Sequence, residues 1–253
     1  MKKAPNAGAA RFLKHLEKAR ELRREVVSGD GLSAEQEALS RWQTQRLAAT
    51  YADFSRHKRF RPAIAFFLED LYGTKDFAQR DTDIERVYPI MVKVLSENAM
   101  HSLSLAVELH ALSQQLDSAM IAMLTEQMAV PLDEGAEVLD KETYAEAYRR
   151  CDNYDQRLRQ IELITETGRL LEEVIHHPVI YITAKLARGP ARAAGFGELQ
   201  DFIERGLSAF RRMKEAAPFL NAIDERETYI LDQVYAGESL TSWQADHFES
   251  PVA

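Results

Sequence analysis

Two adjacent carboxylates, Glu69 and Asp70, lie in a short helical segment that otherwise consists mainly of large apolar side chains. An unpaired buried carboxylate costs several kcal/mol, more than the ~1.5–3 kcal/mol that burying one phenylalanine contributes. The segment is therefore either an enclosed helix whose acids have arginine or amide partners, or a helix whose Phe66 is an exposed anchor for another protein. The simplest alternative is an ordinary helix with both acids reaching solvent at its edge.

Polar side chains also interrupt the apolar faces of two later helices. Arg157 and Glu227 each share a helical face with isoleucines and leucines, so each either covers the rim with its stem or lies inside and is paired. The helix before Arg157 is rich in tyrosines, whose hydroxyls need partners when they are buried. We therefore place any polar pocket in this region.

The predicted ligand- or partner-binding residues combine both regions. They are Phe66, Glu69, Asp70, Tyr148, Asp152, Arg157 and Glu227. Convergence of Glu69, Asp70, Arg157 and Glu227 around a cavity would indicate a binding site. Convergence without a cavity would indicate a structural ion-pair network, which also perturbs pKa values.

Few residues in the sequence have the spacing of metal ligands. A carboxylate-bridged di-metal site in a helical bundle needs two Glu-x-x-His pairs, and the chain offers one, Glu173 with His176. His101 and Glu108 share a face of an earlier helix, but a histidine there is more often a hydrogen-bonded core residue. We predict no metal, no cofactor and no catalytic residue. A metal- or haem-dependent oxidase of ferritin-like or haem-oxygenase-like build is the alternative function.

Composition limits the classes of partner. The 32 basic and 40 acidic residues give a net charge of -8, which makes nucleic acid an unlikely partner. The basic run 56–61 could hold a phosphate, although a solvated connection between helices is the simpler interpretation. The single cysteine, Cys151, excludes an intramolecular disulfide, and we expect a buried structural thiol. No apolar run approaches the ~20 residues needed to span a bilayer, so we expect a cytoplasmic protein without membrane contact.

Helical periodicity runs through nearly the whole chain, which predicts an all-α bundle of about eight helices. Residues 102–128 are the expected central helix, because apolar side chains cover much of its circumference. A C-terminal helical hairpin is expected from helices at 198–213 and 218–235. We predict one domain over residues 1–236 and a poorly ordered tail over residues 237–253.

Local signals set several boundaries. Ser33 and Gln36 form a capping box that begins the second helix. The pattern from 142 to 175 is too long for one ordinary helix and breaks near Asn153. A turn-rich connection is expected at 189–195, from Gly-Pro and a second glycine. Gly168 and Gly206 lie on apolar faces of their helices, where close approach of another helix would explain them.

The string from Phe66 to Tyr72 reads FFLEDLY and resembles the signature of the FFLEELY-motif family, with Asp70 in place of glutamate. Gly73 and the stretches 80–89 and 148–162 are also similar to such proteins. The resemblance implies a bacterial cytoplasmic helical protein of unassigned activity, and it transfers no catalytic residue. Our leading hypothesis is a non-enzymatic domain that binds a protein or a small ligand, although the sequence leaves the question of an enzyme open.

Overall fold

The structure is a computed structural model, and it describes residues 12–18, 32–71, 82–84, 86–89, 91, 97–175, 178–237 and 243–250. Within these ranges the regular elements are helices and helical turns, without strands, so the all-α prediction is confirmed. Among the same residues, no helix combines the length and the apolar character that crossing a bilayer requires.

Residues 12–18 are helical, and the labelled elements begin after them. The first group is α2 (Ala34–Thr50), α3 (Ala52–Arg56), α4 (Arg61–Phe66), η1 (Phe67–Leu71), α6 (Glu97–Ala122) and η2 (Met123–Gln127). The second group is η3 (Leu132–Glu134), η4 (Ala136–Val138), α7 (Lys141–Arg150), α8 (Tyr154–Ile175), α9 (Pro178–Ala193), α10 (Gly197–Met213), α11 (Ala217–Ala236) and η5 (Ala245–His247). Two of these, η1 and η2, are π-helical turns that extend α4 and α6.

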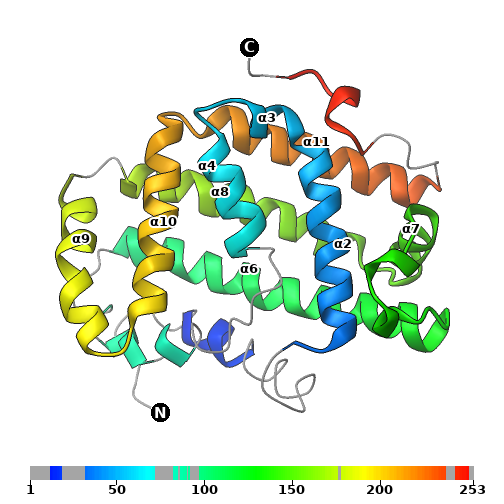
Figure 1. Cartoon of the computed structure of the whole chain (residues 1–253), viewed down its shortest axis with the longest axis horizontal. Coiled ribbons are helices and arrows are strands. Elements are labelled where there is room, and N and C mark those ends of the chain that lie inside the picture. Colours follow the sequence, from blue (N-terminus) through cyan, green and yellow to red (C-terminus); the bar gives the residue numbers. More distant parts are fainter. Residues whose placement is uncertain are drawn as a thin grey trace.

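Three long helices form the centre of the bundle. α8 packs along α6 on one side and along α11 on the other, and α10 and α4 cross in front of them (Figure 1). The expected central helix corresponds to α6 and η2, but α8 is the helix that also contacts α9 and α10. The core therefore lies around α8.

The two C-terminal helices, α10 and α11, meet at a steep corner instead of lying against each other as the expected hairpin (Figure 1). Lys214 takes a positive φ of 64° in this corner, and Arg59 donates to the carbonyl oxygens of Met213 and Glu215. Each helix buries its apolar face against other helices, α10 against α4 and α11 against α8. The residues of both helices were predicted correctly, but their relative direction was not.

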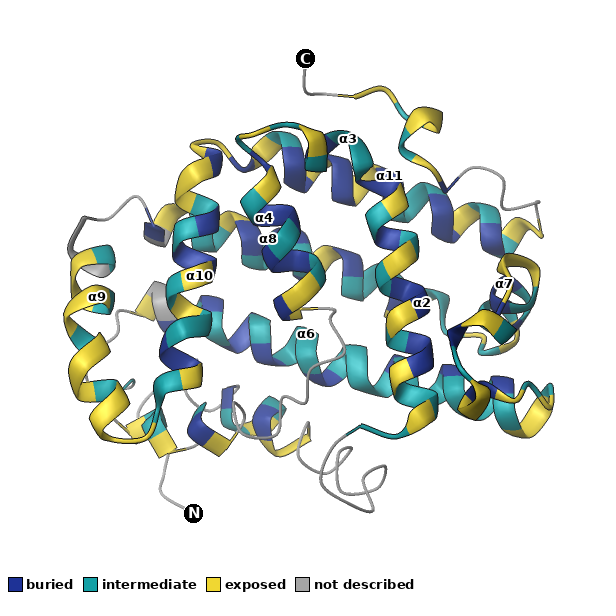
Figure 2. Ribbon diagram, in the orientation of Figure 1, coloured by how far each residue is buried: buried dark blue, intermediate teal, exposed yellow. Residues whose placement is uncertain are grey.

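Several predicted boundaries are confirmed. Ser33 and Gln36 exchange hydrogen bonds of 2.9 and 3.2 Å as a capping box at the start of α2. The long pattern is broken between α7 and α8, next to Asn153. The turn expected at Gly189 and Pro190 is wrong, because α9 continues through both residues. α9 lies on the surface (Figure 2), where water can satisfy the carbonyl that a helical proline leaves unpaired.

Two glycines allow the close helix approach that their positions predicted. A Cβ on Gly206 would lie 2.9 Å from the ring of Phe66, and a Cβ on Gly168 would overlap the methyl groups of Leu220. The α4–η1 segment can therefore insert Phe66 against the backbone of α10. This contact anchors the α4–η1 segment against α10.

We expect Gly206→Ala to destabilise the protein, because Phe66 must shift to make room. Overpacking costs about 1–3 kcal/mol, and the better helix propensity of alanine returns roughly 0.5–1 kcal/mol. The expected net loss is up to about 2 kcal/mol in urea unfolding. Gly197→Ala, at the start of α10, is the control: a Cβ there would make an ordinary contact of 3.6 Å with Arg192 Cγ, so this variant should not lose stability. Equal stability of both variants would contradict the close contact.

Residues 243–250 belong to the segment expected to be a poorly ordered tail, and the structure places them on the bundle. Trp243 is 2% exposed and contacts Trp42 and Tyr144 edge to face. Thr50 Oγ1 donates to the Trp243 carbonyl at 2.7 Å, and Ser250 donates to Asp53 at 2.8 Å. These contacts link the segment to α2 and α3.

Candidate functional site

A partly open chamber of about 60 Å³ lies where α2, α6, α7, α8 and α11 meet. At roughly 10–15 Å³ for each water-sized group, it has room for about four to six such groups. Apolar side chains such as Ile161, Ile164 and Ile230 form much of its wall. Its polar side chains are Gln43, Arg46, Asp117, Tyr144, Tyr148, Arg157, Gln160 and Glu227, and Trp243 lies at its edge.

The corner between α7 and α8 positions Tyr148 and Arg157 on this chamber. Asp152 takes the left-handed conformation in the corner, with φ at 48°, which aspartate tolerates better than most residues. The Asn153 N–H donates to the Tyr235 hydroxyl at 3.0 Å and ties the corner to α11. The Arg157 guanidinium then lies over the Tyr148 ring, 4.4 Å from its centroid.

Arg157 is 4% exposed and carries a charge that few groups compensate. Its Nη2 donates to the Leu116 carbonyl at 3.4 Å, whereas its buried Nε has no hydrogen-bond partner among the described residues. None of the ion pairs in the described part of the chain involves Arg157. The stacking on Tyr148 stabilises the cation in part. An unpaired donor on a buried cation is costly, so this nitrogen marks where an acceptor would be stabilising.

Glu227, on the opposite wall, is fully engaged. Arg46 Nη1 donates to both of its carboxylate oxygens at 2.7 Å, and the Tyr51 hydroxyl donates to Oε1 at 3.0 Å. Burial raises the pKa of Tyr51 well above its ordinary value, so its hydroxyl stays protonated. This pair of charges therefore balances itself.

Asp117 is the remaining acid of the chamber, and Gln43 Nε2 donates to it at 3.0 Å. Burial raises its pKa above the ordinary value, although Arg157, Gln43 and His110 act in the opposite direction. Burial also raises the pKa of Tyr144 and of Tyr148. Burial therefore disfavours the ionised forms of Asp117 and of these two tyrosines.

Asp117→Asn should change how stability depends on pH. Because the folded-state pKa of Asp117 is raised, the wild type loses stability as pH rises from the ordinary value of 3.8 through the higher folded value. Asparagine stays neutral and keeps an acceptor for Gln43, so the variant should gain stability relative to wild type across that range. Urea unfolding at pH 4, 5, 6 and 7 measures the gain. Asp224→Asn, exposed on α11, is the control, and identical pH profiles for both variants would contradict the burial of Asp117.

The other predicted site residues lie away from the chamber. Phe66 is 8% exposed and packs on Phe202, so it is not an exposed anchor. Asp70 is buried and accepts two hydrogen bonds from Arg205 at 2.8 and 3.1 Å, while Glu69 is exposed. The expected convergence of four charged residues is therefore only partial.

Three of the seven predicted residues line the chamber, and the other four do not. Tyr148, Arg157 and Glu227 line the chamber. Phe66 and Asp70 hold the α4–η1 segment, Glu69 is exposed, and Asp152 forms the corner between α7 and α8.

The sequence reasoning missed Arg46, Asp117 and Trp243. Arg46 lies seven residues after Leu39, on the apolar face of α2, which is the same signal that identified Arg157. Asp117 continues a polar line on α6 that includes His110 and is spaced by three or four residues. Trp243 could have been noticed because it is a large apolar side chain within the segment that was expected to be a poorly ordered tail.

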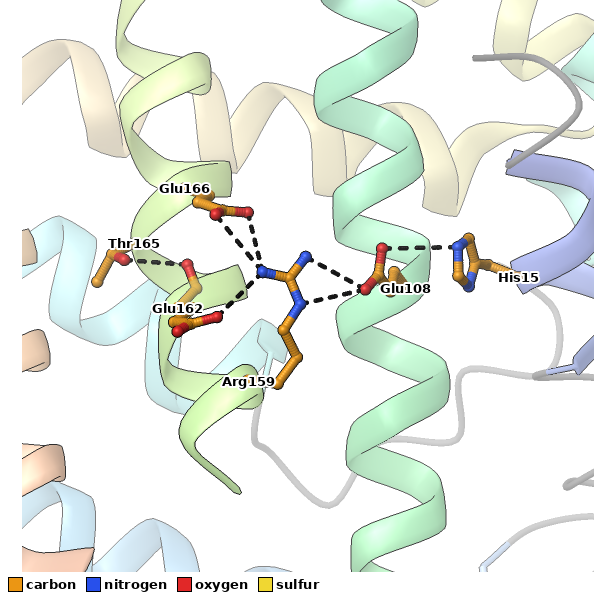
Figure 3. Close-up of polar contacts among 6 residues, drawn as sticks. All are labelled: His15, Glu108, Arg159, Glu162, Thr165 and Glu166. Atoms are coloured by element: carbon orange, nitrogen blue, oxygen red, sulfur yellow. Dashed lines mark hydrogen bonds and ion pairs between the residues drawn. The ribbon is translucent and has the colours of Figure 1, made fainter. Parts of the chain in front are cut away.

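Glu108, one of the residues behind the oxidase alternative, is held in a cluster of ion pairs. Glu108 accepts hydrogen bonds from Arg159 at 3.3 and 3.4 Å and pairs with His15 at 3.5 Å (Figure 3). Arg159 also pairs with Glu162 and Glu166, so the cluster links residues 12–18 to α6 and α8. His176 lies outside the described residues. Across the part that is described, no three His, Cys, Asp or Glu side chains are grouped as metal ligands.

Two further candidate sites are occupied by local contacts. Arg61, in the basic run 56–61, donates to the Ser55 carbonyl oxygen at 3.2 Å. Arg59, in the same run, donates to the Glu215 carbonyl oxygen in the corner between α10 and α11. Cys151 Sγ lies 3.6 Å from the Ala119 carbonyl oxygen, and burial raises the pKa of its thiol. A raised pKa disfavours the thiolate that a nucleophile needs.

Comparison with known families gives one match. A family model described as Domain of unknown function (DUF8198) matches residues 22–241. No curated protein and no solved structure gives a significant match. The matched range contains every chamber residue named above except Trp243.

Proposed function

We propose that this chain, which belongs to the family described as a domain of unknown function (DUF8198), is a non-enzymatic module that binds a small molecule in the chamber around Arg157. One observation carries the proposal: a buried guanidinium with an unpaired Nε lines an interior chamber. Burying such a donor without an acceptor is unfavourable, and a ligand that supplies the acceptor would remove the penalty.

The chemistry of the chamber wall supports binding more than catalysis. Among the described residues, its wall contains no histidine, cysteine, serine, threonine or lysine that could act as a nucleophile or general base. Both chamber tyrosines have raised pKa values, and Glu227 is held by Arg46 and Tyr51. The chamber is also far smaller than the roughly 300–1,000 Å³ of drug-sized ligand sites. The ligand class is therefore small.

A chamber-filling variant tests the proposal. Thermal unfolding of wild type, Ile164→Phe and Ile182→Phe is measured with a panel of anionic, neutral and cationic solutes of up to about six heavy atoms. Ile164 lines the chamber, and Ile182 is 55% exposed on α9. A solute at a hundred times its Kd should raise the Tm of wild type and Ile182→Phe by about 5 to 10 °C.

The Ile164→Phe variant should not respond, because the added ring fills the chamber. Circular dichroism checks that its helices are intact. Equal responses in all three proteins, or no response in wild type, would contradict the proposal. Binding of a protein partner, the likeness to the FFLEELY-motif proteins and a bacterial, cytoplasmic origin stay predictions.

A further inference from the structure

Resting on the proposed function, we infer that the ligand is a small monocarboxylate with a short apolar chain, whose carboxylate accepts from Arg157. The first support is the balance of donors and acceptors. Both oxygens of Glu227 accept from Arg46, and Asp117 accepts from Gln43. Both Glu227 oxygens and Oδ1 of Asp117 thus already accept hydrogen bonds, and a ligand that brings an acceptor of its own would suit Arg157.

The unpaired hydrogen-bond donors also favour a ligand that brings acceptors. Arg157 and Trp243 both line the chamber, and the Nε of Arg157 and the Nε1 of Trp243 are buried without a hydrogen-bond partner among the described residues. Arg157 also offers a guanidinium fork, which matches a carboxylate better than it matches a single oxygen. A neutral ligand could satisfy the hydrogen bond but would leave the charge uncompensated.

Charge gives the second support. Arg46 and Glu227 cancel each other across a 2.7 Å ion pair, and Arg157 has no such partner. Asp117 faces Arg157 from α6, but burial disfavours its ionised form. Arg157 is therefore a buried cation without an ion-pair partner among the described residues, and an anionic ligand would supply one.

Size and wall chemistry give the third support. The volume of about 60 Å³ accommodates about four to six heavy atoms. The chamber wall also includes branched apolar side chains, among them Ile161, Ile164 and Leu231. A short alkyl chain fits such a wall, whereas a second charged group there would lose its hydration without a partner.

The test compares propionate, propionamide and propylamine as probes of nearly equal size. Thermal shift and isothermal titration are carried out on wild type, Arg157→Met and Arg169→Met. Methionine fills the space of a buried arginine without its charge, and such replacements are often tolerated. Arg169 is exposed on the same helix and provides the matched control.

We expect propionate to raise the Tm of wild type and Arg169→Met, and to bind Arg157→Met at least tenfold more weakly. Propionamide and propylamine should give no shift at the same concentration. Binding of propionamide as tightly as propionate, or full propionate affinity in Arg157→Met, would overturn the carboxylate assignment and leave the binding function standing. No response of wild type to any of the small solutes would overturn both.

Discussion

Asp53→Ala is expected to lower the free energy of unfolding by about 3 kcal/mol, because it strands a buried guanidinium. Arg226 is 2% exposed and donates to the two Asp53 oxygens at 2.9 and 2.8 Å. Its Nη1 also donates to the Thr50 carbonyl at 2.7 Å, so the side chain cannot move to water without breaking α2–α11 contacts. Asp53 keeps 14% exposure, which places the loss at the low end of the range for buried pairs.

The double variant Asp53→Ala/Arg226→Met is the control for this prediction. With both charges removed and an apolar side chain in place of the guanidinium, much of the lost stability should return. Urea unfolding of wild type, both single variants and the double variant gives the coupling energy. A loss below about 1 kcal/mol in Asp53→Ala would show that the pair is not buried as described.

The same pair predicts an acid-sensitive contribution. Burial alone would raise the pKa of Asp53, but hydrogen bonds from Arg226 and Ser250 outweigh it and hold the pKa below its ordinary value of 3.8. A depressed folded-state pKa contributes stability that is present above the ordinary value and is lost as pH falls through the folded value. The difference between wild type and Asp53→Ala should therefore be constant above about pH 5 and shrink below pH 3.8.

Trp243→Ala is the second large effect, with an expected loss of about 3–5 kcal/mol. Trp243 packs edge to face on Trp42 and Tyr144 at ring distances of 5.4 and 5.9 Å. Removing the indole would open the chamber at this edge and leave a cavity in the surrounding core. Trp243→Phe keeps an aromatic ring and removes an N–H that has no partner in the described structure, so it should lose less than half as much.

Chemical denaturation of both Trp243 variants measures these losses. A loss below about 1 kcal/mol in Trp243→Ala would contradict the packed position and would favour the poorly ordered tail that the sequence suggested. Because Trp243 forms part of the chamber wall, the same stability losses also test whether this part of the wall is packed as described.

The sequence predicted those parts of the fold that depend on local chemistry. The capping box at Ser33, the break near Asn153 and the close approaches at Gly168 and Gly206 each follow from a few neighbouring residues, and the structure contains all of them. The continuation of α9 through Gly189 and Pro190 could not be predicted from local rules, because surface exposure of the helix removes much of the penalty of the proline. The corner between α10 and α11 depends on Arg59, which lies far away in the sequence.

The candidate site shows the same limit. A charged residue on an apolar face drew attention to Arg157 and Glu227, and the tyrosines drew attention to α7; residues from all three of these positions line the chamber. The pattern of charged residues on apolar faces could not predict ion-pair partners. Asp70 pairs with Arg205 across 135 residues, and Glu227 pairs with Arg46 across 181. Pairing over such separations depends on how the helices pack, which helical periodicity does not specify.

The most direct test of the chamber at Arg157 is a crystal structure of the protein soaked in sodium bromide, with anomalous data collected at the bromine edge. A halide is a small anion that fits the chamber and can be located without ambiguity against water. We expect a bromide peak inside the chamber next to the Arg157 guanidinium, and no such peak in Arg157→Met crystals. Bromide found only on the outer surface, with a chamber that contains nothing but water, would contradict it.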